Sequence, residues 1–292
     1  MPLAHQPAIL LPPAPHGRSL TLRRLVEADP RAALTRLVDA LPSDWGAFGI
    51  GAPLARALGR DLPGLRPFPS LAAPVDIPVT QADVWIGLRG AGRSEVFDRA
   101  AALAAGLDGG FEVADAVDTF LYAGGRDLTG YEDGTANPIG DEAVAVAIGD
   151  AAAPLPASSF VAVQRWRHDL ARFRRHDPAT RDALIGRRLA DNEEIDDAPE
   201  SAHVKRTAQE LYEPEAFMVR RSLPYAAPDD CGLEFVAYCR TLDAFERMLR
   251  HMAGLDDGIV DALFRFSRPV TGGYYWCPPI RDGRLDLTAL GL

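Results

Sequence analysis

One aspartate in this sequence is framed by glycines in a way that could hold its carboxylate over a reacting group. Asp133 lies in "LTGYEDGTANPIG", residues 128–140, between Gly130 and Gly134. Glycine allows backbone conformations and close approaches that a side chain would prevent. A carboxylate within hydrogen-bond reach of a substrate can transfer a proton. The same pattern is equally compatible with an Asx-turn that has only a structural role.

A single histidine, His203, is the second candidate for chemistry. It follows an acidic segment and precedes "VKRTAQELYEPEAF". Imidazole is the commonest metal ligand among side chains, although a lone histidine is more often a surface or core group. The sequence contains no H-E-x-x-H motif, no histidine pair four residues apart beside a carboxylate and no cysteine cluster. A zinc site is therefore unsupported.

Two adjacent arginines form the third candidate. The segment "FMVRRSLPY", residues 217–225, contains Arg220, Arg221 and Ser222. The arginines could bind an anion or simply face solvent, since Lys205 is the only lysine and arginine supplies nearly all of the basic residues. The serine lacks the G-x-S-x-G turn of an acyl-transfer nucleophile. No Walker-type or G-x-G-x-x-G loop follows a strand, which disfavours nucleotide cofactors of those kinds.

The elements that would position these residues form an internal repeat. The segment "DVWIGLRGAGRSEVFDRAAALAAGLDGG" starts at Asp83, and "GLEFVAYCRTLDAFERMLRHMAGLDDG" starts at Gly232. Phe97 matches Phe245, which lies 148 residues later, and half of the 292-residue chain is 146 residues. The sequence therefore indicates a tandem duplication.

Each copy of the repeat predicts a strand followed by a helix. In the second copy, apolar residues alternate over 233–239 as in a strand, and residues at helical spacing follow. Thr241 is in place to cap that helix and Gly254 to end it. In the first copy, Ser94 and Gly106 are expected to have the same two roles.

The repeat predicts the fold class. A further strand and helix are expected upstream of each copy, in residues 19–41 and 159–173. Antiparallel strands interleaved with helices on one face are typical of an α+β ferredoxin-like fold, which we expect twice. We predict an N-terminal half over residues 1–150 and a C-terminal half over residues 151–292. The acidic, aperiodic segment 189–203 predicts a long loop of the kind that often carries function.

Composition and charge limit the partners. The chain is 47% hydrophobic and 25% charged, which is close to ordinary soluble usage and excludes disordered and fibrous classes. The net charge is 31 − 41 = −10, which disfavours nucleic acid and anionic membrane surfaces. Small molecules or other proteins are favoured as partners.

Cysteines and apolar runs indicate the compartment. Three cysteines cannot all pair within the chain, and none forms a C-x-x-C unit; they are Cys231, Cys239 and Cys277. The first residues have no basic segment followed by an apolar run, and no window reaches the roughly 18 apolar residues of a membrane span. These features predict a reduced, cytoplasmic setting.

Taken in order, several segments resemble the dye-decolourising peroxidases, a family of haem proteins. They are "GYEDGTANP", "FVAVQRWRHDL", "IGRRLADNEEI", "SAHVKRT", "MVRRSLPY" and "FRFSRPVTGGYYWCPP". The resemblance covers about residues 80–280, and Gly130, Asp133 and Gly134 match the hallmark G-x-x-D-G of the family. It implies a duplicated ferredoxin-like α+β barrel with haem b in the C-terminal half, which agrees with the repeat.

The resemblance implies roles for residues on one side of the haem. His203 matches the proximal histidine, which binds the iron through one ring nitrogen. Asp261 falls where the family has a carboxylate that accepts the other ring N–H, which makes the ligand more electron-donating. Asp256 and Asp257 lie close by in the sequence and are the alternatives.

On the other side, Asp133 and Arg220 match the distal catalytic pair, with Ser222 at a nearby polar position. Arg221 is the alternative if the register is shifted by one residue. Asp133 would move the proton of hydrogen peroxide, and Arg220 would stabilise the charge on the departing oxygen.

Arg187 is expected to bind a haem propionate through its guanidinium, with the adjacent Arg188 as the alternative. Aromatic residues could relay electrons from bulky reductants, although core packing is the commoner role for such residues. They are Trp166, Tyr212, Tyr274, Tyr275 and Trp276.

The resemblance implies a haem-dependent peroxidase that reduces hydrogen peroxide and oxidises organic reductants such as dyes or phenolics by one-electron steps. Family members often form homo-oligomers, so an oligomer is expected. Two alternatives stay open: a haem-binding or haem-handling protein with incidental peroxidase activity, and a cofactor-free interaction protein in which His203 and Asp133 are structural.

Overall fold

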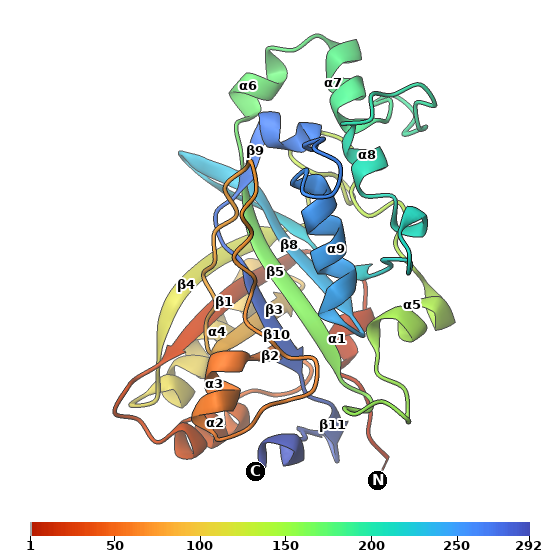
Figure 1. Cartoon of the computed structure of the whole chain (residues 1–292). Coiled ribbons are helices and arrows are strands. Elements are labelled where there is room, and N and C mark those ends of the chain that lie inside the picture. Colours follow the sequence, from red (N-terminus) through yellow and green to blue (C-terminus); the bar gives the residue numbers. More distant parts are fainter. Residues whose placement is uncertain (1) are drawn as a thin grey trace.

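Alternating apolar residues build long strands that cross the middle of the molecule, with helices beside them (Figure 1). The computed structural model describes residues 2–292. The strands are β1 His16–Arg24, β2 Gly46–Gly51, β3 Val84–Gly90, β4 Phe111–Phe120, β5 Ser159–His168, β6 Val219–Arg220, β7 Leu223–Ala227, β8 Asp230–Cys239, β9 Ser267–Pro269, β10 Gly273–Cys277, β11 Ile280–Arg281 and β12 Arg284–Leu285.

The helices lie mainly between strands in the chain order. They are α1 Pro7–Leu10, α2 Pro30–Asp39, α3 Ala52–Ala57, α4 Arg93–Leu107, α5 Gly140–Ala147, α6 Leu170–Arg174, α7 Pro178–Ile185, α8 His203–Arg206 and α9 Leu242–Met252, with short 3₁₀ turns η1 Gln209–Leu211, η2 Ala262–Arg265 and η3 Thr288–Leu290. Within residues 2–292, no helix is both long and apolar enough to cross a membrane.

The main sheet repeats one strand order. Its path runs β4-β1-β3-β2-β10-β5-β8-β6, and the pairings along it are antiparallel. Each half contributes four strands to this path. When these four are numbered in chain order, both groups follow the order 4-1-3-2, as a ferredoxin-like fold does. The groups join where β2 pairs with β10, Gly51 opposite Tyr275 and Ile50 opposite Trp276. The predicted duplicated ferredoxin-like fold is confirmed.

The predicted boundary at residue 150 stays a prediction. It falls between α5 and β5, but one sheet runs through both halves. By residue number, the loop around residues 127–133 belongs to the predicted first half, yet it contacts the second half. Asp127 contacts His168 at the end of β5, and the Tyr131 hydroxyl donates to Asp182 in α7.

Helix α9 forms as the apolar spacing predicts. Phe245, Met248, Leu249 and Met252 are buried on one face, which packs on β5 and β8. Thr241 lies at the predicted N-cap position, although its side chain makes no capping hydrogen bond.

The start of α4 differs from the prediction by two residues. Gly92 is the N-cap and Ser94 lies inside the helix. The carboxylate of Glu95 accepts the Ala91 N–H at 2.7 Å. Glu95 in the first helical turn therefore binds the backbone just before the helix, and the Gly92 cap itself makes no side-chain hydrogen bond.

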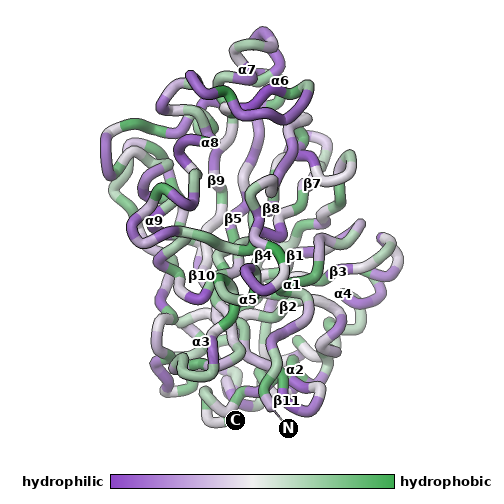
Figure 2. The backbone as a smooth tube through the Cα atoms, turned by 90° about the vertical axis from the view of Figure 1, so that its right-hand side faces the viewer, coloured by the Kyte–Doolittle hydropathy of each residue, from purple (hydrophilic) through white to green (hydrophobic). Residues whose placement is uncertain are grey.

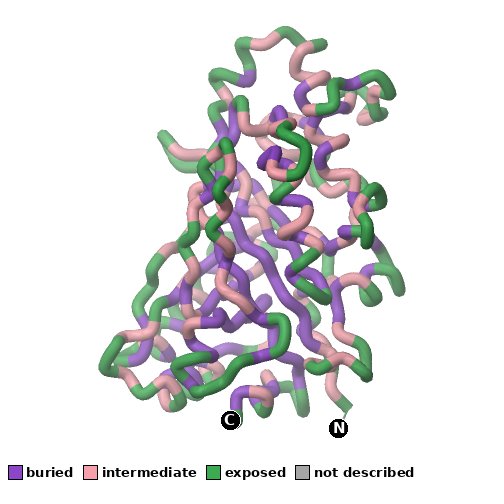
Figure 3. Tube along the Cα trace, viewed as in Figure 1, coloured by how far each residue is buried: buried purple, intermediate pink, exposed green. Residues whose placement is uncertain are grey.

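Strand alternation divides the core into two layers. In β3, Val84 and Ile86 belong to a large cluster that includes residues of α2, α4 and α9, whereas Trp85 belongs to a second cluster with Val236 and Tyr238 of β8. Neighbouring strand residues point to opposite faces, so one sheet contributes to both layers. The strands are largely buried, and exposed residues gather in the peripheral loops (Figure 3). Around α6 and α7 the chain is largely hydrophilic (Figure 2).

Candidate active site

A cavity of about 890 Å³, which includes space open to solvent, lies between the helix-side face of β5 and β8, helices α8 and α9, and the loop at residues 127–133. Much of its wall is apolar, from residues such as Phe235, Phe245, Met248, Met252, Leu263 and Phe266. Its polar residues include Asp127, Asp133, Gln164, His168, His203 and Arg220. The structure therefore brings His203, Asp133 and Arg220 to one cavity.

His203 is the first residue of α8, and a buried carboxylate holds its ring in place. Its Nδ1 lies 2.8 Å from Oδ2 of Asp261, whose side chain is fully buried. The other Asp261 oxygen accepts the Leu263 N–H at 2.8 Å. Burial lowers the pKa of His203, but the Asp261 carboxylate outweighs it and the pKa is raised. The bond to Nδ1 leaves Nε2 as the ring nitrogen for a ligand.

The two alternative carboxylates are bound elsewhere. Asp257 pairs with the buried Arg206 at 2.7 Å, and Asp256 lies 3.7 Å from Arg250. Arg206 also donates to the His251 carbonyl at 2.7 Å, which ties α8 to the end of α9. Among the three neighbouring aspartates, Asp261 is the one bonded to the imidazole.

Asp133 reaches the cavity from the glycine-framed loop. Gly130 and Gly134 have φ of +95° and +74°, a region that side chains rarely adopt, and the Asp133 N–H donates to the Gly125 carbonyl at 3.1 Å. The carboxylate borders the cavity, and Asp133 is an exposed residue on that side. Partial burial against the loop raises the pKa of Asp133, and the positive charge of Arg220 opposes this only in part.

The two adjacent arginines at the end of β6 face opposite sides of the sheet. Arg220 lines the cavity, where its Nε is buried without a hydrogen-bond partner within residues 2–292. Arg221 points to the other side, where its guanidinium donates to the carbonyls of Leu10 at 2.7 Å and Arg220 at 2.9 Å. Because neighbouring strand residues face opposite ways, only Arg220 can share a cavity with Asp133.

Asn137 ties the loop to the strand. Its side-chain oxygen accepts the Arg220 N–H at 2.8 Å, and its side-chain nitrogen donates to the Arg220 carbonyl at 2.8 Å. Both backbone groups of Arg220 are thus bound to a residue four positions after Asp133. This clamp fixes the acid and the guanidinium relative to each other.

Three predicted site residues do not line this cavity: Asp261, which contacts His203, and Ser222 and Arg187. The Ser222 hydroxyl accepts the Val236 N–H at 3.2 Å within the sheet, so it is not brought to Asp133. Arg187 binds the Asn192 carbonyl at 2.8 Å and the Glu194 carboxylate, which occupies two of its terminal nitrogens. The adjacent Arg188 pairs with Asp191 and Glu193 in the same loop. The role of Ser222 near the distal pair and the propionate role of Arg187 both stay predictions.

Sequence analysis missed a buried network of polar side chains at the cavity wall. His168 contacts Ser267 through Nδ1 at 2.7 Å and Asp127 through Nε2 at 3.0 Å. Burial raises the pKa of Asp127, but its bonds to His168 and Thr129 lower it by more. Asp127 lies six residues before Asp133 in the same glycine-rich segment, which was the available signal. The partners come from residues 168 and 267, so their meeting required the fold.

Gln164 is a second missed residue. It lies on β5 with 1% of its surface exposed and lines the cavity, and its side-chain nitrogen has no hydrogen-bond partner within residues 2–292. A buried donor without a partner is uncommon in folded proteins. Gln164 and Arg220 thus both line the cavity, and each has one buried nitrogen without a partner within residues 2–292.

Comparison with known proteins gives the same family as the motifs. The profile "Dyp-type peroxidase, C-terminal" matches residues 124–282. A dye-decolorizing peroxidase from Mycolicibacterium paratuberculosis is 32% identical over 210 residues, 70% of this chain and 59% of the relative. One from Mycobacterium tuberculosis is 32% identical over 224 residues, 74% of this chain and 67% of the relative.

Solved structures agree over nearly the whole chain. A dye-decolorizing protein from V. cholerae has a TM-score of 0.84 at 29% identity and covers 97% of this chain and 98% of that chain. A Rhodococcus jostii DypB variant in complex with haem has a TM-score of 0.84 at 25% identity and covers 93% and 95%.

Fold and cavity thus define an α+β protein of duplicated ferredoxin-like type with a histidine–carboxylate pair facing an aspartate–arginine pair. The chain belongs to the dye-decolourising peroxidase family. It spans 59% of the length of the Mycolicibacterium relative, less than two thirds.

Proposed function

We propose that this protein is a haem-dependent peroxidase that reduces hydrogen peroxide and oxidises organic reductants such as dyes or phenolics by one-electron steps. The observation that carries the proposal is the arrangement of one cavity. The imidazole of His203, held by Asp261, lines the same space as Asp133 and Arg220.

The residues present fit haem b. Within residues 2–292, no group of three or more His, Cys, Asp or Glu side chains could hold a bare metal ion. A single imidazole with a free Nε2 suits iron whose other ligands come from a porphyrin. The phenylalanine, leucine and methionine side chains of the wall suit the apolar faces of such a ring. The haem in the Rhodococcus structure supports the same cofactor.

Each polar residue then has a defined task. When bound, haem iron supplies the redox chemistry between peroxide and the reductant. Asp261 holds the His203 N–H and so fixes the ring with Nε2 toward the cavity. Asp133 accepts a proton from hydrogen peroxide and returns it to the departing oxygen. Arg220, which lines the same cavity, stabilises the negative charge that develops on that oxygen.

The test starts from His203→Ala, because this change removes the proposed iron ligand. The purified full chain, expressed with added haem, should show the intense porphyrin absorption band, and peroxide should change it within a stopped-flow mixing experiment. His203→Ala should lose the band. His176→Ala is the matched control, since that histidine does not line the cavity. Equal haem content in both variants would contradict the ligand assignment.

The same measurements separate the haem-handling alternative. A peroxidase should keep its haem through gel filtration and turn over a phenolic reductant repeatedly. Slow turnover together with reversible haem loss would favour a haem-handling protein instead.

Compartment and assembly are also part of the proposal. The three cysteines are free thiols, and Cys239 and Cys277 are buried, which supports a reducing, cytoplasmic setting. Phe97 on α4 and Val113 on the sheet-edge strand β4 are 61% and 48% exposed, which supports a homo-oligomer that covers them. Light scattering of wild type and Val113→Lys tests the assembly.

A further inference from the structure

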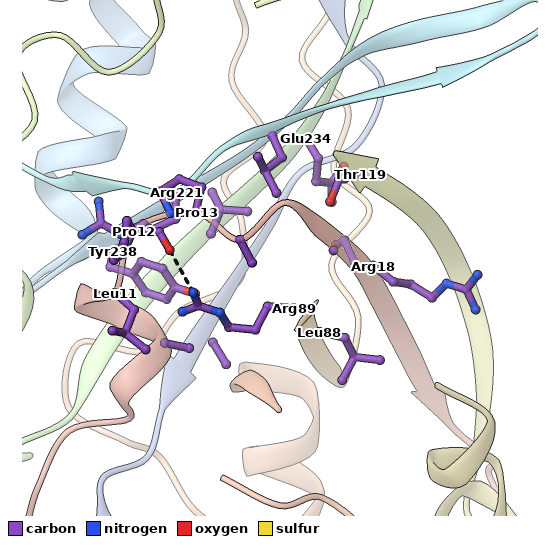
Figure 4. A pocket seen from close by; sticks show the side chains of 18 of the residues that line it. Leu11, Pro12, Pro13, Arg18, Leu88, Arg89, Thr119, Arg221, Glu234 and Tyr238 are labelled. Carbon is purple, nitrogen blue, oxygen red and sulfur yellow. Dashed lines mark hydrogen bonds between the residues drawn. The ribbon is translucent and has the colours of Figure 1, made fainter. Parts of the chain in front are cut away.

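A second cavity, of about 540 Å³ when the space open to solvent is included, lies on the opposite face of the strands that carry the first. Strands β1 and β3 of the first half form one wall and β8 of the second half forms another, while residues 8–14 close one side. Arg89, Arg221 and Tyr238 gather at one end of this space, and Arg18 and Thr119 lie at the other (Figure 4).

Two guanidinium groups line this cavity without a carboxylate partner. Arg89 donates to the Pro12 carbonyl at 2.9 Å, and Arg221 donates to the carbonyls of Leu10 and Arg220. Neither forms an ion pair with any residue of 2–292, and the Arg221 Nε is buried with no hydrogen-bond partner there. Carbonyl oxygens satisfy some N–H groups but leave both positive charges uncompensated.

The electrostatics at these groups show the missing charge. Burial lowers the pKa of Arg89 and of Arg221, and the charge of Arg89 lowers that of Arg221 further. The Tyr238 side chain opposes both effects only in part. Because guanidinium stays protonated in proteins, two like charges are held near each other in a partly desolvated space. A bound anion would relieve both costs.

The other charged residues of the wall are already paired. Glu234 accepts from Arg165 at 3.2 Å, and burial raises the pKa of Glu234 despite that partner. Arg18 pairs with Asp118 at 2.5 Å. Neither residue neutralises the two free arginines.

The rest of the wall is largely apolar, with Leu88, Leu223, Val236 and Trp85 beside the polar end. Inorganic anions would leave this surface in contact with water. A ligand with an anionic head and an apolar body would use both parts of the cavity, through charge-assisted hydrogen bonds at one end and burial of carbon surface at the other.

We propose that this cavity binds a small organic monocarboxylate, with its carboxylate between Arg89 and Arg221 and its apolar body against Leu88, Leu223 and Val236. This site is separate from the haem cavity, and binding there does not require haem.

The test is calorimetric titration of the full chain with benzoate, alongside benzamide as the neutral analogue of the same shape and inorganic phosphate as an anion without an apolar body. Benzoate should bind with one equivalent. Benzamide and phosphate should each bind at least about 10-fold more weakly, because each lacks one of the two interactions. Raising the salt concentration should weaken benzoate binding.

Two variants locate the ligand. Arg89→Gln and Arg221→Gln should each weaken benzoate binding about 10-fold or more, since each removes a charged donor. Arg220→Gln, which faces the haem cavity, and Arg284→Gln, whose side chain is 83% exposed, are matched controls that should leave it unchanged.

Equal affinity for benzoate and benzamide, or for benzoate and phosphate, would overturn the proposal, as would an absence of binding. Loss of binding in Arg220→Gln but not in Arg221→Gln would place benzoate in the haem cavity and overturn it too. The ligand and salt comparisons use the wild-type chain, so they decide the matter even if a variant fails to fold.

Discussion

Arg220 and Arg221 are neighbours in the sequence and belong to different cavities. Arg220 shares its space with a carboxylate, Asp133, and with a histidine, whereas Arg221 shares its space with another arginine. The strand period of two sends the adjacent side chains to opposite faces of one sheet. Chemical environment here follows from the side of the sheet and not from closeness along the chain.

The largest effect on the peroxide rate is expected from substitution of one of the two adjacent arginines. Arg220→Leu should keep haem but slow the reaction with peroxide on the order of 100-fold or more, because it removes the group that stabilises developing negative charge. Arg221→Leu should leave that rate nearly unchanged. Stopped-flow measurement of both variants decides this, and equal losses would mean that the two faces are not independent.

The clamp between loop and strand should give the next effect. Asn137→Ala removes both side-chain bonds to the Arg220 backbone, so we expect a loss of stability of about 1–3 kcal/mol. The peroxide rate should fall about 10-fold, since the acid and the guanidinium lose their common anchor. Urea unfolding and stopped-flow rates on one preparation test this. A stability loss with an unchanged rate would show that the clamp does not position Arg220.

The pH dependence sharpens the role of the carboxylate. Asp133 must be ionised to accept the peroxide proton, and burial raises its pKa above the usual aspartate value. The rate should therefore fall as the pH drops through a midpoint above that usual value. Asp133→Asn should be slow at every pH and lose this dependence. An identical pH profile in Asp133→Asn and wild type would assign the transition to another group.

The smallest effect is expected on the other face. Glu234→Gln keeps a hydrogen-bond acceptor for Arg165, which also pairs with Asp115 at 2.6 Å. Because burial already raises the pKa of Glu234, the change should cost about 1 kcal/mol or less in stability. The peroxide rate should not change. A large drop in that rate would reveal coupling between the cavities.

The fold was predictable because the repeat is written in the sequence. Phe97 and Phe245 both lie in the first turns of α4 and α9, although Phe97 is exposed and Phe245 is buried, and the two groups of strands share one order. The helix start at Gly92 was missed because glycine has no capping side chain, whereas serine is a preferred N-cap residue and Ser94 follows two positions later.

The site was predictable where a residue carries its own local signal. Asp133 has its glycines, and His203 has a distinct context after the acidic loop. The choice between Arg220 and Arg221 required the pairing of β6 with β8, which no local pattern specifies. The chain of Asp127, His168 and Ser267 joins three distant segments through single contacts, so only the folded arrangement reveals it.

The loop that carries Asp133 has a consequence for any attempt to divide the molecule. A fragment that starts after residue 150 would retain His203, Asp261 and Arg220, yet it would lack the aspartate and the Asn137 clamp. Such a fragment could at most bind a porphyrin, because it would lack the residue that transfers the proton. The first half is therefore more than a structural support. The loop that follows it in the chain places the aspartate in the cavity of the second half.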